Sequence, residues 1–327
     1  MIMTPIKSLL AIPLAALLSA AAPAAADSET ETLNVLFIGN SYTGRHNLSE
    51  LVKEMAEAGN PGLTFNPTTV IYGGRTLADH WRLGTQNFVG IANLTKADEE
   101  ATIASLKETI ANNPEDSHAA RALARHEELL ADLESQRTNW DVVVLQSYRD
   151  DLEGNPTSYA QFAPKFAELA QAQGARVILY ETTPTTQNLE ALAAPPDPAP
   201  VHEKANAIAA LANQINAQAA PMSLVALHCQ TERPDLTLRF INDAHLNHTM
   251  AYLTASTLYA ALFNQSPQGI PVDSVTDIRF LNNDPENKDK DRDGNPITRT
   301  FNEKDRADLQ RIAWEGFTEF QSLRDEE

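Results

Sequence analysis

The alternation of strand-like and helical segments constrains the fold of this chain more than any other feature. Five short apolar runs have the composition of buried strands, and segments with apolar residues at helical spacing lie between them. The strand-like runs are Asn34–Ile38, Thr68–Tyr72, Asp141–Leu145, Arg176–Tyr180 and Leu224–His228, and the helical segments include 47–58, 158–172, 202–217 and 248–263. Because such alternation is typical of a parallel sheet covered on both faces, we expect an α/β fold, a three-layer α/β/α sandwich with about five parallel strands.

One stretch interrupts the alternation between the second and third strand-like runs. Residues 95–137 carry two helical patterns separated at Asn113-Pro114, and they are rich in charged residues. This pattern predicts a helical hairpin inserted into a single domain of residues 27–327. The charge is typical of a solvated helix face.

The first 26 residues have the pattern of a bacterial signal peptide. Lys7 precedes an apolar stretch, Leu9–Leu18, that is too short to span a bilayer, and small residues follow up to Ala26. We therefore expect cleavage after Ala26 and a bacterial protein that works in the periplasm or outside the cell. Cys229 is the only cysteine, so no disulfide within the chain is expected.

The overall charge excludes some classes of partner. The chain has a formal net charge of −19 at pH 7. Nucleic acids and anionic membranes are bound by basic surfaces, so neither is an expected partner. No later segment is apolar enough to enter a membrane once the signal peptide is removed.

Two short elements carry residues suited to nucleophilic catalysis. The first strand ends in Gly39, and Ser41 follows at the sheet edge where α/β proteins bind ligands. A serine there presents its hydroxyl to a substrate, although a lone Gly-x-Ser would favour a helix N-cap. Near the C-terminus, His245 lies on a loop beside Asp243, just before a helix, which suits a base oriented by a carboxylate.

Together these elements resemble the sequence blocks of the SGNH/GDSL hydrolases. Gly39-Asn40-Ser41 is similar to the first block, Gly73-Gly74 to the second, and His245-Leu246-Asn247 to the last. The resemblance runs from about residue 34 to residue 314, outside the inserted hairpin. It implies a flavodoxin-like SGNH fold with Ser41 as nucleophile, His245 as base, and the N–H groups of Ser41 and Gly74 in the oxyanion hole.

The chain departs from the family pattern at two positions. The third block of the family has a Gly-x-Asn whose amide donates to the oxyanion, whereas this chain has Gln146, either a replacement donor or an ordinary polar residue at a strand end. The family acid lies three residues before the histidine, where this chain has Asn242. Asp243, two residues before the histidine, is the preferred candidate for the acid, with Asn242 as the alternative.

The resemblance implies a function as well as a fold. We expect a serine esterase that hydrolyses short-chain, notably acetyl, esters through an acyl-enzyme intermediate, with a small-molecule or carbohydrate ester as substrate and no required cofactor. The alternative is a non-catalytic carbohydrate-binding or scaffold protein on the same fold, which the two departures keep open.

A separate acidic run resembles the start of a calcium-binding loop. Asp289, Asp291 and Asp293 occupy alternate positions before Gly294, as calcium-binding loops require. The twelfth position is Thr300, where a bidentate glutamate is expected. The sequence therefore favours a solvated acidic loop and leaves a calcium site as the alternative.

Overall fold

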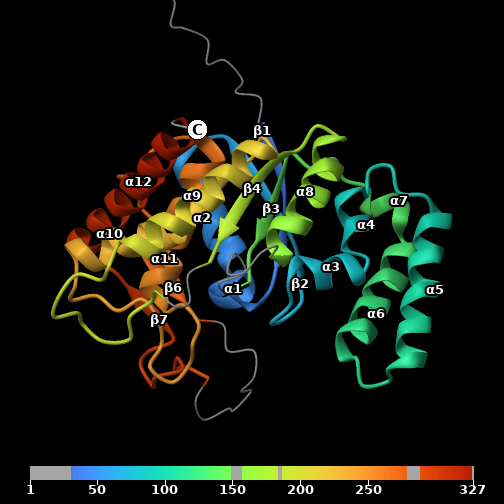
Figure 1. Ribbon diagram of the computed structural model, residues 1–327, viewed down its shortest axis with the longest axis horizontal. Coiled ribbons are helices and arrows are strands. Elements are labelled where there is room, and N and C mark those ends of the chain that lie inside the picture. The colour runs from blue at the N-terminus through green and yellow to red at the C-terminus, as the bar shows by residue number, and fades with distance from the viewer. Residues whose placement is uncertain (1–30, 149–156, 183–185, 278–287, 326–327) are drawn as a thin grey trace, which may run out of the picture.

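A central parallel sheet organises the molecule, as Figure 1 shows. The computed structural model describes residues 31–148, 157–182, 186–277 and 288–325, so the expected signal peptide lies outside the described residues. The five strands are β1 (Glu31–Gly39), β2 (Leu63–Ile71), β3 (Val142–Gln146), β4 (Arg176–Glu181) and β5 (Gln218–Pro221), in the spatial order β2-β1-β3-β4-β5. All four strand pairs are parallel, which confirms the predicted α/β/α sandwich.

Helices cover both faces of the sheet because alternate residues of each buried strand point to opposite sides. One face packs against α2 (Leu48–Gly59), α11 (His248–Phe263) and α12 (Glu303–Asp325). The other packs against α3 (Leu77–Arg82), α8 (Ser158–Gln171) and α9 (Ala199–Gln214), and α10 (Met222–Glu232) contacts α9 and α12. The shorter elements are α1 (Ser41–Gly44), the 3-10 turn η1 (Arg45–Asn47), α4 (Thr85–Val89), and the antiparallel pair β6 (Ser274–Thr276) and β7 (Thr298–Thr300).

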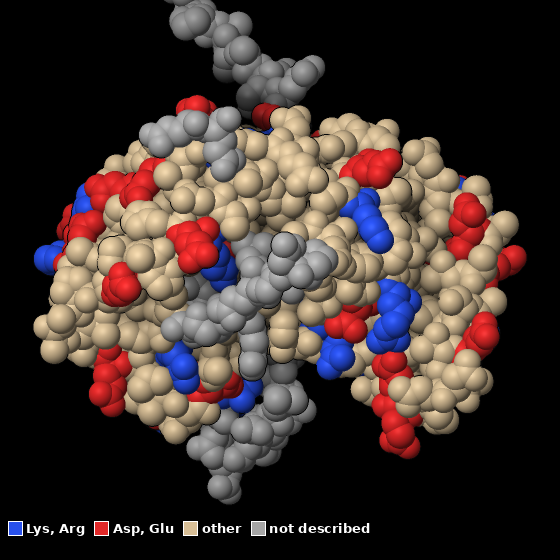
Figure 2. Space-filling model, in the orientation of Figure 1, with Lys and Arg blue, Asp and Glu red and all other residues tan. Residues whose placement is uncertain are grey.

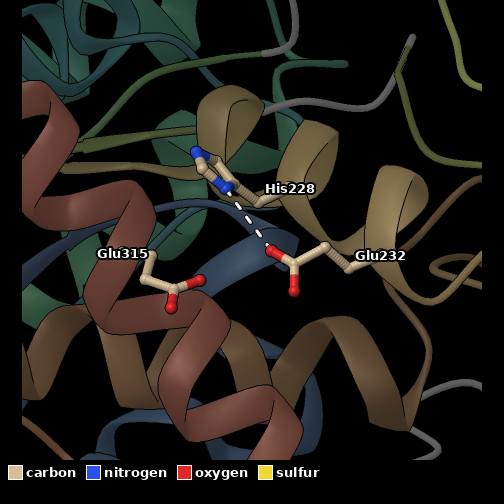
Figure 3. A group of neighbouring side chains, drawn as sticks. All are labelled: His228, Glu232 and Glu315. Carbon is tan, nitrogen blue, oxygen red and sulfur yellow. Dashed lines mark ion pairs between the residues drawn. The ribbon is translucent and has the colours of Figure 1, made fainter.

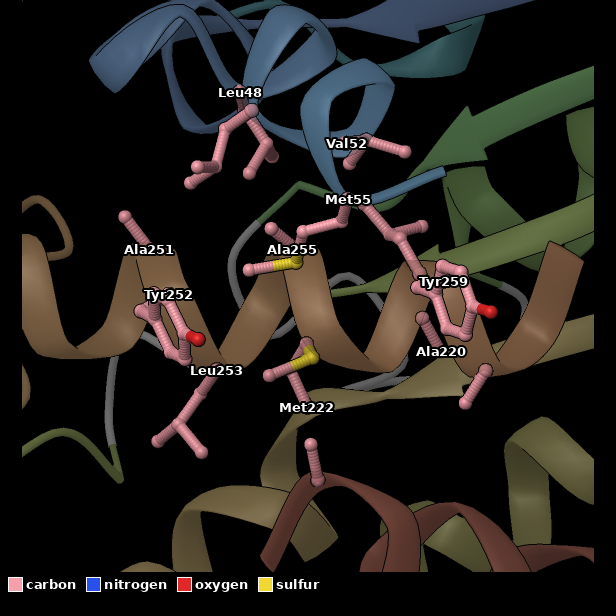
Figure 4. Packing of buried hydrophobic residues seen from close by; sticks show 14 of the residues in the cluster. Leu48, Val52, Met55, Ala220, Met222, Ala251, Tyr252, Leu253, Ala255 and Tyr259 are labelled. Atoms are coloured by element: carbon pink, nitrogen blue, oxygen red, sulfur yellow. The ribbon is translucent and has the colours of Figure 1, made fainter. Parts of the chain in front are cut away.

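Helix α11 is enclosed on every side. Every residue from His248 to Leu262 is buried, which agrees with a sequence that is apolar around its whole circumference. Figure 4 shows α11 packed between Met55 of α2 and Met222 at the start of α10. The start of α11 is therefore fixed in the core, and the loop that precedes it is attached to a rigid element.

The segment between β2 and β3 forms additional helices at one end of the molecule. Figure 1 shows α5 (Lys96–Asn112), α6 (Ser117–Ala131) and α7 (Leu133–Gln136) far from α11 and α12. The inner side of α6 joins the core through His126, whose Nδ1 pairs with Glu99 Oε1 at 2.6 Å and whose Nε2 donates to the Leu83 carbonyl at 3.0 Å. The outer faces carry the charge and contact solvent.

The fifth predicted strand is wrong in position. Leu224–His228 lies inside helix α10, and the fifth strand is the preceding segment Gln218–Pro221. The cause is that residues 222–227 are all buried, so the run lacks the polar face by which an amphipathic helix is recognised. A short, fully apolar run has the same pattern as a buried strand or as a turn of enclosed helix.

On the face shown in Figure 2, acidic side chains are scattered with basic ones among them. None of the helices in the described ranges combines the length and the apolar character that a membrane span requires.

Candidate active site

The chain turns at Ser41 in the place where the sheet topology reverses. Strand β1 lies between β2 and β3, so the connections leaving β1 and β2 run to opposite sides of the sheet, and the carboxyl end of β1 is the place where α/β sheets generally bind ligands. Asn40 ends the strand and caps α1, because its Oδ1 accepts the N–H of Tyr42 at 3.0 Å. This cap places Ser41 at the first position of a short helix at the sheet edge.

Three predicted site residues meet although they come from opposite ends of the sequence. The Nε2 atom of His245 lies 2.8 Å from Ser41 Oγ, within hydrogen-bond distance. The other ring nitrogen, Nδ1, forms a hydrogen bond with Asp243 Oδ1. This is the geometry of a nucleophile, a base and an acid that orients the base.

A local turn explains why the acid lies two residues before the histidine. Asp243 Oδ1 also accepts the backbone N–H of His245 at 3.1 Å, which is the Asx-turn that aspartate forms with the residue two positions later. The turn brings the carboxylate to the ring of the same histidine. Asn242 is exposed, and its N–H donates to Asp293 Oδ1 at 3.0 Å. The structure therefore places Asp243, and not Asn242, against the imidazole.

Two arginines that the sequence did not single out hold Asp243. Its Oδ2 lies 3.1 Å from the buried Arg45 and 3.3 Å from Arg292. Burial raises the pKa of Asp243, but the hydrogen bond from His245 and the charges of His245 and Arg45 outweigh this effect and lower the pKa below its usual range. The carboxylate therefore stays ionised at neutral pH. An arginine four residues after the serine is no recognisable signal by itself.

The two backbone N–H groups expected in the oxyanion hole are available. Within the described part of the chain, the N–H groups of Ser41 and Gly74 have no acceptor. Gly74 has a φ of +66°, a conformation that favours glycine, and its loop is fastened to the site because Asn40 Nδ2 donates to the Arg75 carbonyl at 3.1 Å. The two N–H groups are therefore linked through Asn40, which precedes Ser41 in the chain and is hydrogen-bonded to the loop of Gly74.

Gln146 has a different role from the oxyanion donor considered above. Its Nε2 donates to Asn40 Oδ1 at 2.8 Å and to the Ser147 carbonyl at 2.7 Å, so both amide hydrogens are committed. Its Oε1 accepts from the Asn40 N–H at 2.9 Å and the Thr43 hydroxyl at 2.6 Å. Gln146 is a buried positioning residue that fixes Asn40, the residue before the serine.

The acidic loop at 289–294 braces the loop that carries Asp243 and His245, and its carboxylates do not converge as calcium ligands. The two oxygens of Asp293 accept the N–H groups of Ile241 and Asn242 at 2.9 and 3.0 Å. Asp291 Oδ1 accepts two N–H groups of its own loop at 2.8 and 2.9 Å. Asp289, Asp291 and Asp293 do not bring their oxygens within 4.8 Å of one another. The sequence pattern is therefore explained by hydrogen bonding to backbone.

Removing this brace gives a direct test of its role. We expect Asp293→Ala to lower kcat for an ester about tenfold, because the loop that carries the acid and the base loses two anchors and small misplacements are costly. Asp289→Ala is the matched control, since Asp289 is exposed and, among the described residues, bonds only through its backbone carbonyl. A calcium site would instead make both variants defective and make a chelator inhibitory, which steady-state kinetics with and without EDTA distinguishes.

Three other histidines near the site donate hydrogen bonds to backbone carbonyls. His46 Nε2 donates to the Leu246 carbonyl at 2.8 Å, and burial lowers the pKa of His46 to about 3. His80 Nε2 donates to the Gly39 carbonyl at 2.9 Å, and burial lowers the pKa of His80 to about 4. His248, on the first turn of α11, donates to a backbone carbonyl at 2.9 Å. Of the histidines in the described ranges, His245 is the one hydrogen-bonded to Ser41.

Comparisons with known proteins do not assign a function to this chain. No protein-family model matches the sequence, and no curated protein matches it significantly. Similar solved structures include a DUF4886 family protein from Bacteroides uniformis, with 16% identity, a TM-score of 0.47, and coverage of 88% of this chain and 95% of that one. A suggested SGNH hydrolase from Slackia heliotrinireducens has 19% identity and a TM-score of 0.42, over 71% of this chain and all of its own.

A third similar structure is a gut microbial diltiazem-metabolizing enzyme. It has 11% identity and a TM-score of 0.33, over 72% of this chain and 47% of its own. At such identities and TM-scores, none of the three likenesses carries a conclusion about the activity of this chain.

Proposed function

We propose that this protein is a serine esterase of the SGNH hydrolase type. The observation that carries the proposal is the contact of 2.8 Å between Ser41 Oγ and His245 Nε2, together with the hydrogen bond from the other ring nitrogen to Asp243. In the proposed reaction Asp243 is the ionised acceptor of the hydrogen bond from Nδ1, and Nε2 is the atom that accepts the serine proton.

The first half of the proposed reaction forms an acyl-enzyme. His245 Nε2 takes the proton of the Ser41 hydroxyl while Oγ bonds to the ester carbonyl carbon. The carbonyl oxygen gains negative charge and accepts hydrogen bonds from the N–H groups of Ser41 and Gly74. When the tetrahedral intermediate collapses, the bond to the alcohol oxygen breaks, and His245 gives its proton to that oxygen.

The second half releases the acid. His245 Nε2 takes a proton from a water molecule, whose oxygen bonds to the acyl carbon, and the bond to Ser41 Oγ breaks as the serine regains a proton. Asp243 remains ionised throughout and stabilises the imidazolium that forms in both halves. Arg45 and Arg292 hold the carboxylate in place during these steps.

The proposed substrates are short-chain esters, with acetyl groups on carbohydrates as the leading class. This part of the proposal rests on the resemblance to exported SGNH hydrolases. A series of p-nitrophenyl esters from acetate to octanoate, followed by an acetylated oligosaccharide, would define the acyl length and the alcohol.

Covalent labelling tests the reaction class directly. We expect a fluorophosphonate to add once per chain, at Ser41, and to abolish hydrolysis of p-nitrophenyl acetate, because only an activated serine reacts readily. Intact-mass and peptide mass spectrometry locate the adduct. A folded protein with neither labelling nor turnover would favour the non-catalytic carbohydrate-binding or scaffold alternative.

A further inference from the structure

A second group of polar side chains lies away from Ser41, between the two helices α10 and α12. Figure 3 shows His228 and Glu232 of α10 facing Glu315 of α12. One nitrogen of His228 and one oxygen of each glutamate all lie within 4.8 Å of one another. An imidazole and two carboxylates are a ligand set that proteins use for zinc.

The hydrogen bonding of His228 prepares one of its nitrogens to bind a cation. Its Nε2 lies 2.6 Å from Glu319 Oε2, so a neutral ring places its proton there and leaves the lone pair on Nδ1. Nδ1 faces Glu232 Oε1 at 3.8 Å, which is too long for a hydrogen bond. Two coordinate bonds of about 2.1 Å to a shared ion span such a distance. A carboxylate behind a metal-binding histidine is the arrangement that fixes the ring in metal sites.

The net charge of this group is suited to a divalent cation. Arg311 binds one oxygen of Glu232 at 2.7 Å and one oxygen of Glu315 at 2.6 Å, which orients both carboxylates and leaves each a second oxygen. With Glu319, the partner of His228, included, the group holds three carboxylates and one guanidinium. When the imidazole is neutral, an ion of charge +2 balances the remaining negative charge.

Close packing of the two helices holds the ligands opposite each other. A Cβ atom on Gly316 of α12 would lie 3.1 Å from the Cα of Val225 in α10, so only glycine permits this approach. His228 is one helical turn from Val225, and Glu315 precedes Gly316. The ligands therefore come from two rigid elements whose separation is fixed by the core.

We propose that His228, Glu232 and Glu315 form a zinc-binding site, with Glu319 and Arg311 as the residues that orient them. Zinc is the class of ion indicated, because one nitrogen and two oxygens from protein with water in the remaining position suit it, whereas calcium prefers six or more oxygens. The ion would join α10 to α12 and stabilise the fold, independently of the esterase reaction.

Calorimetric titration of the full chain with Zn²⁺ at neutral pH tests the site. We expect one Zn²⁺ per chain and a rise in Tm on binding, because the ion binds the folded state. His228→Ala and the near-isosteric Glu232→Gln should each weaken binding at least tenfold. Glu319→Gln, which touches only the orienting carboxylate, should weaken it about 10–100-fold.

His118→Ala is the matched control, since it removes a partly exposed histidine from α6, outside the group. It should bind Zn²⁺ as the wild type does. If the wild type binds no Zn²⁺, the group is an ion-pair network only and the proposal fails. Binding that survives in both His228→Ala and Glu232→Gln would place the ion elsewhere, for example at His245, and would also overturn it.

Discussion

Ser41→Ala should reduce kcat for p-nitrophenyl acetate by about 10⁴–10⁶-fold. The hydroxyl oxygen is the only atom that the proposed reaction bonds to the acyl carbon, so its loss leaves only the stabilisation that the oxyanion hole gives to direct attack by water. The measurement is steady-state hydrolysis with a protein concentration high enough to follow the residual rate. Activity within about tenfold of wild type, which corresponds to only about 1.4 kcal/mol, would place the nucleophile elsewhere.

The fold should be unaffected by this substitution. Ser41 is partly exposed, and among the described residues its side chain is hydrogen-bonded only to His245, so the free energy of unfolding should change by less than about 1 kcal/mol. His245→Ala should be about as inactive as Ser41→Ala, and the double variant no worse than either single one, since the residues act as a unit. Additive losses would show that they work separately.

Asp243→Asn should lower kcat by about 10²–10⁴-fold with little change in KM. A carboxylate both fixes the tautomer of His245 and stabilises the imidazolium that forms during attack. The amide of asparagine does not stabilise that charge, and it can hold the ring in the wrong tautomer. The effect develops in the transition state, so a steady-state analysis should assign it to kcat.

Folding must be measured beside activity for this variant. Removing the charge leaves Arg45 and Arg292 facing a neutral side chain, and loss of one partner from a buried ion pair costs about 3–5 kcal/mol. Circular dichroism at the assay temperature separates unfolding from a catalytic defect. Asn242→Ala is the matched control and should retain near-normal kcat. A silent Asp243→Asn with a higher kcat for Asn242→Asp would show that the acid acts from the position three residues before the histidine.

Much of the scaffold could be predicted from the sequence because it is encoded locally. The apolar runs at 34–38 and 141–145 are long enough, and end sharply enough, to be recognised as strands, and Ser41 follows the first one directly. His248 begins α11 after the cap residue Asn247, which places His245 on the loop before it. The boundaries of these strands, turns and helices depend on residues that are close in the sequence, so they can be predicted from one sequence.

The sequence pattern led to a wrong prediction where a buried strand and an enclosed helix have the same run of apolar residues. The residues 224–227 are apolar without interruption, and only their position between α9 and α12 decides that they continue a helix. The surroundings select the structure there, and they come from distant parts of the chain. For the alternate aspartates from 289 to 293 the sequence favours a solvated acidic loop, and the calcium alternative stays a prediction.

The sequence by itself determined four of the five strands, the serine at the edge of the sheet and the histidine on the loop before α11, because periodicity and turn residues act over a few positions. Only the tertiary structure decided the partners of these groups. Gln146 meets Asn40 across 106 positions, and Arg45 meets Asp243 across 198. Such pairs are set by how the helices and loops pack on the sheet, and the energy of a buried polar group depends on which partner it reaches.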